Sequence, residues 1–141
     1  MTISKAKLWN SLDQFTKAYI EALLWQAGED EQGNQIDRNY DQFSLTIESL
    51  QRIKKDCEKF QKLAGDLILT EGNCLRGTGE YSQLEQAGHD FCLTRNRHGA
   101  GFWETTDWEE QAGKKLTEIS QSFPEDNVFP RNKRVLDAIS M

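Results

Sequence analysis

Hydrophobic residues recur at intervals of three and four positions in the first half of the chain, which is the spacing of one face of an α-helix. This pattern predicts one helix over about residues 7–27 and a second helix over about residues 46–69. The polar stretch between them, residues 28–42, carries no such stripe and predicts a long loop. Because each helix has one apolar face, we expect the two to pack together as an antiparallel helical hairpin.

A third helix is predicted over about residues 107–123, because Pro124 cannot continue a helix. Asp107 and Glu110 have the spacing of a side-chain pair that caps a helix N-terminus. The apolar stripe of this helix consists of Trp108, Ala112, Leu116, Ile119 and Phe123. Near the C-terminus, the apolar residues between 135 and 139 fit either a last helical turn or a short strand.

The segment between the second and third helices has a different pattern. Phe91 and Leu93 alternate with other residues over 90–94, as in a strand with one apolar face, and residues 102–103 also favour a strand. The glycines between these two stretches tolerate the positive φ angles that tight turns need. A small β-hairpin is therefore predicted over about residues 89–104.

The chain has 141 residues, the length of one ordinary domain. We therefore expect a single domain spanning residues 1–141. Its predicted fold class is mostly α (α+β), with a helical hairpin, a small β-hairpin and a third packed helix.

The charge and the cysteine content of the chain limit the cellular compartment and the class of partner that we expect. The formal net charge of −6 repels phosphate, so non-specific nucleic-acid binding is not expected. No window approaches the roughly 20 apolar residues of a membrane span, and the first residues lack the apolar run of a signal peptide. The three cysteines contain no Cys-x-x-Cys pair, which favours free thiols in a reducing, cytosolic environment.

The predicted β-hairpin contains both histidines of the chain, which raises the question of metal binding or catalysis. His89, Asp90 and His98 are residue types that bind metals, and Cys92 with a histidine is a nucleophile pair. However, no second ligand motif exists elsewhere in the chain, and Cys92 fits equally well as a small buried residue. We therefore expect no metal, no cofactor and no catalytic residue, and a non-enzymatic role is favoured over an enzymatic one.

Binding of a ligand or a partner is the hypothesis that this segment favours over metal binding and catalysis. Arg95, Arg97 and His98 place positive charge at a turn, and arginine makes planar, bidentate contacts with carboxylate or phosphate. Trp103 lies close by in sequence and offers a ring for stacking. The opposing interpretation is that Arg95 pairs internally with Asp90 or Glu104 and locks the hairpin. The candidate binding residues are His89, Asp90, Arg95, Asn96, Arg97, His98 and Trp103.

The same residues also resemble the motif of a known protein family. The stretch QAGHDFCLTRNRHGAGFW, followed by GKKLTEISQSF and preceded by DCEKFQKLAGDLI, resembles a family of small proteins of tailed phages and mobile elements. The hallmark of that family is AGHDF-x-LTRN-x-HGAGFW followed by a G-x-x-LTE helix, and the match spans about residues 56–123. The chain departs from the pattern at Cys92, where the family often has tryptophan, and over residues 104–107, which replace a more glycine-rich stretch.

The resemblance implies a phage origin and a setting in the host cytoplasm, and it brings no mechanism or catalytic residue with it. Small phage proteins outside the virion and replication modules often act by binding host machinery. We therefore expect an accessory protein that binds a host protein and modulates or inhibits it. The alternative is a small-ligand protein that sequesters or processes a nucleotide-like anion. A purely structural role for the motif, and a homo-oligomeric state, also stay open.

Overall fold

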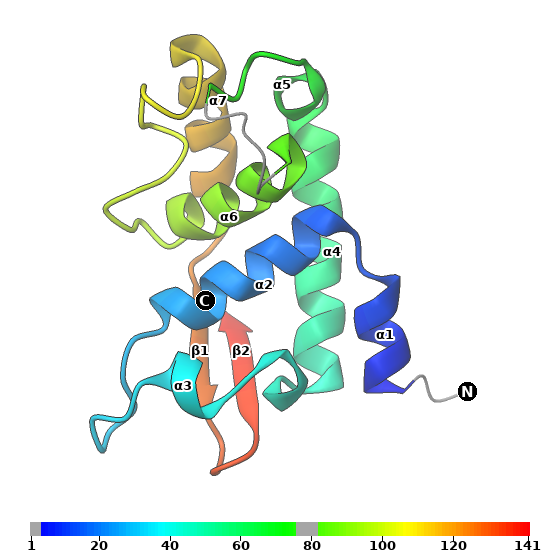
Figure 1. Cartoon of the computed structure of the whole chain (residues 1–141), viewed down its shortest axis with the longest axis vertical. Coiled ribbons are helices and arrows are strands. Elements are labelled where there is room, and N and C mark those ends of the chain that lie inside the picture. The colour runs from blue at the N-terminus through cyan, green and yellow to red at the C-terminus, as the bar shows by residue number, and fades with distance from the viewer. Residues whose placement is uncertain (1–3, 76–81) are drawn as a thin grey trace.

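Figure 1 shows the computed structural model, which describes residues 4–75 and 82–141. The described chain is mostly helical with a small two-stranded antiparallel sheet, so the predicted mostly α, α+β class is confirmed. In chain order, the elements are α1 (Lys5–Ser11), α2 (Gln14–Gln26), α3 (Ile36–Asn39), the 3₁₀ turn η1 (Gln42–Ser44), α4 (Ile47–Ala64), α5 (Asp66–Leu69), α6 (Gln83–Arg95), α7 (Glu110–Gln121), β1 (Asp126–Pro130) and β2 (Leu136–Ser140).

The helix predicted over residues 7–27 is in fact two helices, α1 and α2. Leu12 has an extended backbone between them, and the carboxylate of Asp13 accepts a hydrogen bond from the backbone N–H of Thr16 (2.8 Å). A side chain that satisfies a free N–H in this way starts a new helix. The chain turns at this cap, so α1 lies beside α4 whereas α2 crosses α4 (Figure 1).

The second predicted stripe is buried, but its helix ends before residue 69. Gly65, with a φ of 51°, terminates α4, and the short helix α5 follows directly. The predicted stripe residues that α4 buries are Leu50, Ile53, Cys57, Phe60 and Ala64. The packing of the first two helices differs from the antiparallel hairpin that the sequence predicts. Although α2 contacts α4, it packs most extensively along α6, which covers much of its apolar face.

The contact between α2 and α6 lies at the centre of the core. A Cβ atom at Gly88 of α6 would lie 2.1 Å from the carbonyl oxygen of Phe15, so only glycine permits this close approach of the two backbones. The ring of Phe60 then stacks on that of Phe91 with 4.1 Å between centroids and on that of Phe15 with 5.5 Å. Residues of α2, α4 and α6 therefore share one aromatic cluster.

The β-hairpin predicted over residues 89–104 is wrong. Residues up to Arg95 belong to α6, and the remainder of the segment forms turns. The helix begins at a reciprocal cap: the hydroxyl of Ser82 accepts from the N–H of Glu85 (3.2 Å), and the carboxylate of Glu85 accepts from the N–H of Ser82 (3.3 Å). This capping box outweighs the strand-like alternation of the apolar residues that follow.

The antiparallel hairpin lies instead at the C-terminus. Strands β1 and β2 pair with Asp126 opposite Ser140, and the apolar residues from Leu136 to Ile139 therefore lie in a strand rather than a helical turn. The side chain of Asn132 shapes the connecting turn, because its oxygen accepts a hydrogen bond from the N–H of Val135 (3.0 Å). Thus a side chain replaces the glycine that such turns often contain.

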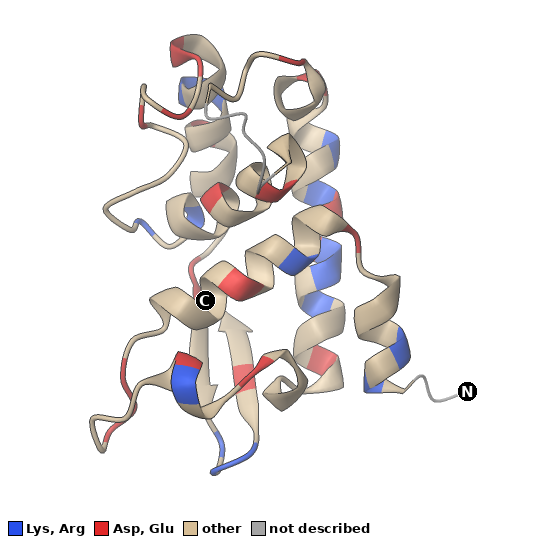
Figure 2. Ribbon diagram, viewed as in Figure 1, with Lys and Arg blue, Asp and Glu red and all other residues tan. Residues whose placement is uncertain are grey.

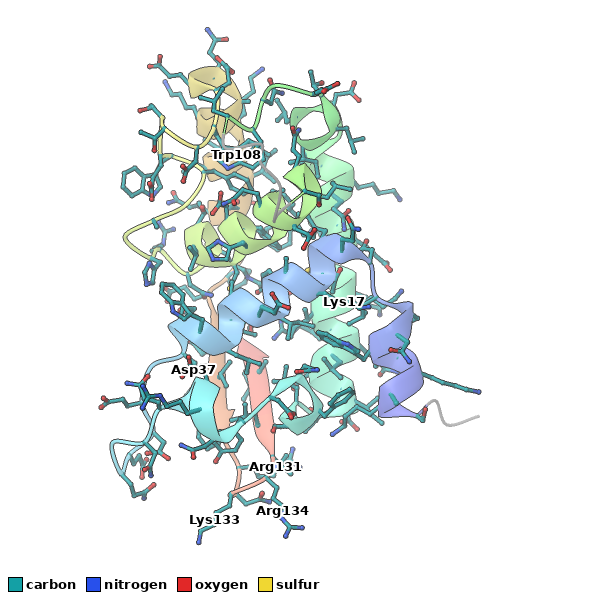
Figure 3. All side chains as sticks on the ribbon, viewed as in Figure 1. Lys17, Asp37, Trp108, Arg131, Lys133 and Arg134 are labelled. Carbon is teal, nitrogen blue, oxygen red and sulfur yellow. The ribbon has the colours of Figure 1, made fainter. Side chains whose placement is uncertain are left out.

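The third predicted helix exists and is shorter than expected. It is α7, and its cap is Glu109 rather than Asp107; the Glu109 carboxylate accepts from the N–H groups of Gln111 (3.1 Å) and Ala112 (2.8 Å). Trp108, which was assigned to the helical stripe, is fully buried just before the helix begins. Figure 3 shows it within the upper part of the molecule.

Charged residues cover the outer faces of most elements (Figure 2). Lysines and arginines follow α4 and the turn between the strands, whereas acidic residues gather on the loop between α2 and α3 (Figure 2). Within residues 4–75 and 82–141, no helix is long and apolar enough to cross a membrane. The cysteines Cys57, Cys74 and Cys92 are all buried and form no disulfide.

Candidate binding surface at the end of helix α6

Helix α6 ends in a turn, where the sequence predicted the turn of a β-hairpin instead. The N–H of Arg97 donates to the carbonyl of Thr94 (3.1 Å), and the N–H of His98 donates to the carbonyl of Leu93 (2.9 Å). This pair of bonds is a Schellman motif, in which one residue takes the left-handed conformation. That residue is Arg97, with a φ of 55°; no other described residue except glycine has a positive φ. Glycine is favoured at such a position because a Cβ atom crowds the backbone there.

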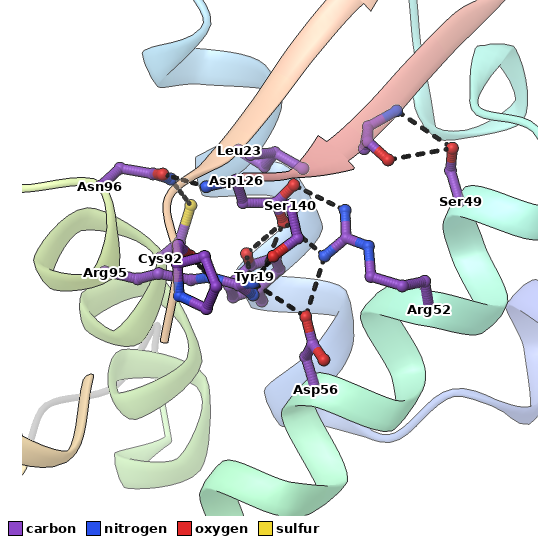
Figure 4. A network of polar contacts seen from close by, with 12 residues as sticks. Tyr19, Leu23, Ser49, Arg52, Asp56, Cys92, Arg95, Asn96, Asp126 and Ser140 are labelled. Atoms are coloured by element: carbon purple, nitrogen blue, oxygen red, sulfur yellow. Dashed lines mark hydrogen bonds and ion pairs between the residues drawn. The ribbon is translucent and has the colours of Figure 1, made fainter. Parts of the chain in front are cut away.

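Just before this turn, Arg95 points into the protein and is only 1% exposed (Figure 4). Its Nε donates to the carbonyl of Pro124 (2.7 Å), and one terminal nitrogen donates to the hydroxyl of Tyr19 (3.1 Å). The other terminal nitrogen lies 2.9 Å from both the hydroxyl of Ser140 and a carboxylate oxygen of Asp56. All three guanidinium nitrogens are therefore engaged inside the fold.

Asp126, at the start of β1, is the second centre of this network and is also 1% exposed. Its carboxylate accepts hydrogen bonds from the hydroxyl of Tyr19 and from two nitrogens of Arg52 (2.6 and 3.2 Å), and Arg95 lies 3.8 Å away. Its backbone N–H donates to the side-chain oxygen of Asn96 (2.7 Å). The network thus connects α2, α4 and α6 to the C-terminal hairpin (Figure 4).

Burial and charge pairing together set the ionisation of these groups. Burial, followed by the nearby carboxylate of Asp126, raises the pKa of Tyr19 well above its ordinary value, so its phenol stays protonated and donates. Burial alone would lower the pKa of Arg95, but Tyr19, Asp126 and Asp56 outweigh it and raise that pKa. Burial also raises the pKa of the Cys92 thiol, so this residue lacks the thiolate that a nucleophile requires.

These contacts decide between the two interpretations of Arg95 and correct one detail. Arg95 locks the fold, but neither Asp90 nor Glu104 is its partner; the carboxylates come from α4 and β1. Asn96 likewise faces inward, since its side chain bonds to Asp126 and lies 3.7 Å from the sulfur of Cys92. Neither residue is available to a ligand.

The side chain of Asp90 also forms its hydrogen bonds inside the protein. One carboxylate oxygen accepts hydrogen bonds from the indole N–H of Trp108 (2.7 Å) and the amide of Gln86 (2.9 Å), and the other lies 3.2 Å from Nδ1 of His89. Because Trp108 lies at the far end of the loop after α6, this carboxylate fastens the loop to the helix. Asp90 is therefore part of the scaffold and not of a binding surface.

The start of the same loop is held by Thr94. Its hydroxyl accepts a hydrogen bond from the N–H of Phe102 (3.0 Å), and the ring of Phe102 is buried. A Cβ atom at Gly101 would lie 2.2 Å from that hydroxyl, so glycine is required for the loop to fold back this closely. Most of the motif therefore determines the shape of the loop.

The remaining candidate residues face outward, and the two histidines among them meet a tryptophan from another helix. Arg97, His98 and Trp103 are exposed, and His89 is half-buried. The ring of Trp25 in α2 lies 5.5 Å from that of His98 and 6.4 Å from that of His89. Trp25 is 56% exposed and Trp103 is 53% exposed. We call these five residues the Trp25–Trp103 surface.

A shallow hollow continues this surface from His98 to Trp103. Gly99, directly after His98, lines a hollow of about 350 Å³ together with Trp103 and Glu104. Within the described chain, the side chain of Arg97 makes no hydrogen bond or ion pair. The surface therefore combines two exposed indole rings with a free guanidinium, which suits contact with another macromolecule.

The outward residues of the motif could be identified from the sequence, whereas their neighbours on other elements could not. Trp25 lies off the buried stripe of α2, and that is the one signal in the sequence that could have marked it as exposed. Arg52 and Asp56 are four residues apart on α4, the spacing of a helical ion pair. No local pattern marked Asp126, because its role depends on contacts with residues far away in sequence.

Two further findings concern metal binding and similarity to known proteins. In the described parts of the chain, no group of three or more His, Cys, Asp or Glu residues is placed to hold a metal ion. Comparisons with models of protein families, with curated proteins and with solved structures find no match. The geometry of this chain and the resemblance of its motif therefore remain as guides to its function.

Proposed function

We propose that this protein is a non-enzymatic accessory protein that binds a host protein in the host cytoplasm and modulates it. The Trp25–Trp103 surface makes the contact. The phage-like motif supports the setting, and the composition of the surface supports the mode of action. Tryptophan and arginine are the residue types most enriched at the energetic centres of protein interfaces.

The observation that carries the proposal is the conformation of Arg97. A residue with a Cβ atom at a φ of 55° costs stability that glycine would not. The guanidinium of Arg97 does not offset this cost, because the side chain is exposed and unpaired within the described chain. A costly residue whose side chain has no internal task is a sign of selection for function.

The alternative function, capture of a nucleotide-like anion, receives less support. It depended on Arg95 and Arg97 acting together, and Arg95 is occupied by Asp56 and Asp126. One exposed arginine and a hollow of about 350 Å³ remain, with Glu104 beside it. A carboxylate at that place opposes a phosphate ligand.

The test is capture of a partner from bacterial lysate by the tagged protein, followed by native mass spectrometry. Arg97→Ala keeps a Cβ atom at the strained position, so the melting temperature should not change, whereas capture should be lost. Arg134→Ala, at an exposed arginine in the turn between the strands, is the matched control and should capture normally (Figure 3).

Two results would contradict the proposal. One is capture of the same protein in the same amount by Arg97→Ala and by Trp103→Ala. The other is a retained small mass without any protein, which would favour the anion-binding alternative instead.

A further inference from the structure

The outer edge of β1 presents backbone groups to which no other part of the described chain bonds. The N–H of Arg131 bonds to the carbonyl of Val135, and the N–H of Met141 bonds to the carbonyl of Glu125. Because these bonds fix the alternation along the hairpin, the N–H and carbonyl of Val128 point away from β2. In the described chain no group bonds to them.

Among the three residues of β1 that face outward, only Val128 offers an N–H that is free within the described chain. Two positions before Val128, the outward N–H of Asp126 already donates to the side chain of Asn96 (2.7 Å). Two positions after it, Pro130 has no N–H to offer. Natural proteins protect sheet edges with such devices, and here they leave room for a short segment while discouraging extended strand pairing.

A groove of about 800 Å³ lies along this edge. Val128, Phe129 and Pro130 form one wall, and the loop between α2 and α3 forms the other. In Figure 1 this loop extends on the side of β1 that faces away from β2. Ile36 and Tyr40 contribute apolar surface, and the hydroxyl of Tyr40 donates to the carbonyl of Asn132 (2.8 Å). That bond joins the two walls near the turn of the hairpin.

The loop wall is acidic (Figure 2). Glu29, Asp30 and Glu31 line the groove, against a single cationic side chain, Lys133, at the turn of the hairpin. Asp30 also holds the shape of the loop, because its carboxylate accepts from the N–H groups of Gln32 and Asn34 (2.9 Å each). Its pKa is lowered by these bonds, so the charge persists at neutral pH. The groove therefore carries net negative charge.

We propose that this groove binds a short extended segment of a partner protein that carries lysine or arginine, which adds to β1 as a third strand at Val128. Main-chain bonds to a free edge and side-chain contacts with a groove are the recognised means of such strand addition. The carboxylates select basic side chains, and the protected positions on either side limit the pairing to a few residues. This proposal does not depend on the Trp25–Trp103 surface.

The probe is an acetylated and amidated peptide in which lysine and valine alternate, titrated into the ¹⁵N-labelled protein. We expect the amide signal of Val128 to shift most and its hydrogen exchange to slow. Affinity should fall with added salt, because the contact is partly electrostatic. The same peptide with glutamate in place of lysine should not bind.

Variants separate the two components of the site. Val128→Pro removes the free N–H without breaking a bond to β2, just as Pro130 already does at an equivalent position, and should weaken binding by up to about tenfold. Glu29→Gln combined with Glu31→Gln should weaken binding several-fold. Glu118→Gln, at an exposed carboxylate on α7, is the control and should bind normally.

The proposal is overturned if the glutamate peptide binds as well as the lysine peptide, or if both groove variants bind undiminished. It is also overturned if sedimentation shows that the unliganded protein forms dimers that Val128→Pro abolishes, because the edge would then serve a second copy of the chain. If Val128→Pro does not fold, the double glutamine variant and the Val128 amide shift still decide the question.

Discussion

Arg95 and Arg97 are two residues apart in the same motif, yet they belong to different parts of the molecule. Arg95 is buried at the end of α6, and all of its guanidinium nitrogens have partners on other elements. Arg97 is exposed, lacks a side-chain partner in the described chain, and takes a conformation that favours glycine. The first arginine connects elements of the fold, whereas the second takes a conformation that costs stability and is available for binding.

The same division separates other neighbours in the motif. Asp90 is buried against Trp108, but His89 next to it lies beside the exposed ring of Trp25. Trp108 is fully buried, but Trp103 in the same loop is 53% exposed. A motif rich in charged and aromatic residues is therefore not one site: its inward residues shape a loop, and its outward residues are presented by that loop.

The largest expected effect comes from making one substitution at both arginines. Arg95→Met removes the cation between Asp56 and Asp126, although Asp126 keeps Arg52 and Tyr19, and should destabilise the protein by about 3 kcal/mol. Arg97→Met removes an exposed charge and should change stability by less than about 0.5 kcal/mol. Urea unfolding of both variants, followed by circular dichroism, measures the difference.

Equal losses in the two variants would remove the distinction between a buried and an exposed arginine. A small loss for Arg95→Met would show that apolar packing compensates for the ion pairs, as happens in some proteins with buried salt bridges.

A second contrast compares adjacent residues on α6. Asp90→Ala leaves the indole N–H of Trp108 and the amide of Gln86 without their acceptor, and should cost about 2 kcal/mol. His89→Ala, on the outward side, should cost less than about 0.5 kcal/mol. Thermal unfolding of both variants checks this difference. A larger loss in His89→Ala would mean that the imidazole, and not the carboxylate, holds the loop.

The parts of the fold that follow from local pattern could be predicted. The stripe of α4 was recognised because one face is apolar and the other charged, and Pro124 correctly marked the region where α7 ends. Helix α6 was missed because residues on nearly all its sides are buried, so it lacks a simple stripe. The pair Ser82 and Glu85 was the available signal, since it is a capping box.

The parts that depend on distant contacts could not be predicted. Arg95 was expected to pair within its own segment, and instead it pairs with Asp56 and Asp126, which lie on α4 and β1. Nothing in the residues around Asp126 indicates that β1 passes the end of α6. Conversely, the outward position of Arg97 followed from its place in a turn, which was expected although the turn was assigned to a hairpin.

The smallest of the three expected contrasts is also the most direct test of why Arg97 is there. Arg97→Gly relieves the left-handed strain at the end of α6 and should stabilise the protein by about 1 kcal/mol, or raise its melting temperature by about 2–4 °C. Arg97→Ala keeps the strain and should melt like the unmodified protein. Both variants should lose partner capture, because both lack the guanidinium. A gain in stability together with a loss of binding would mean that this position trades one for the other, whereas a glycine variant that is more stable and binds normally would leave the arginine without a role in binding.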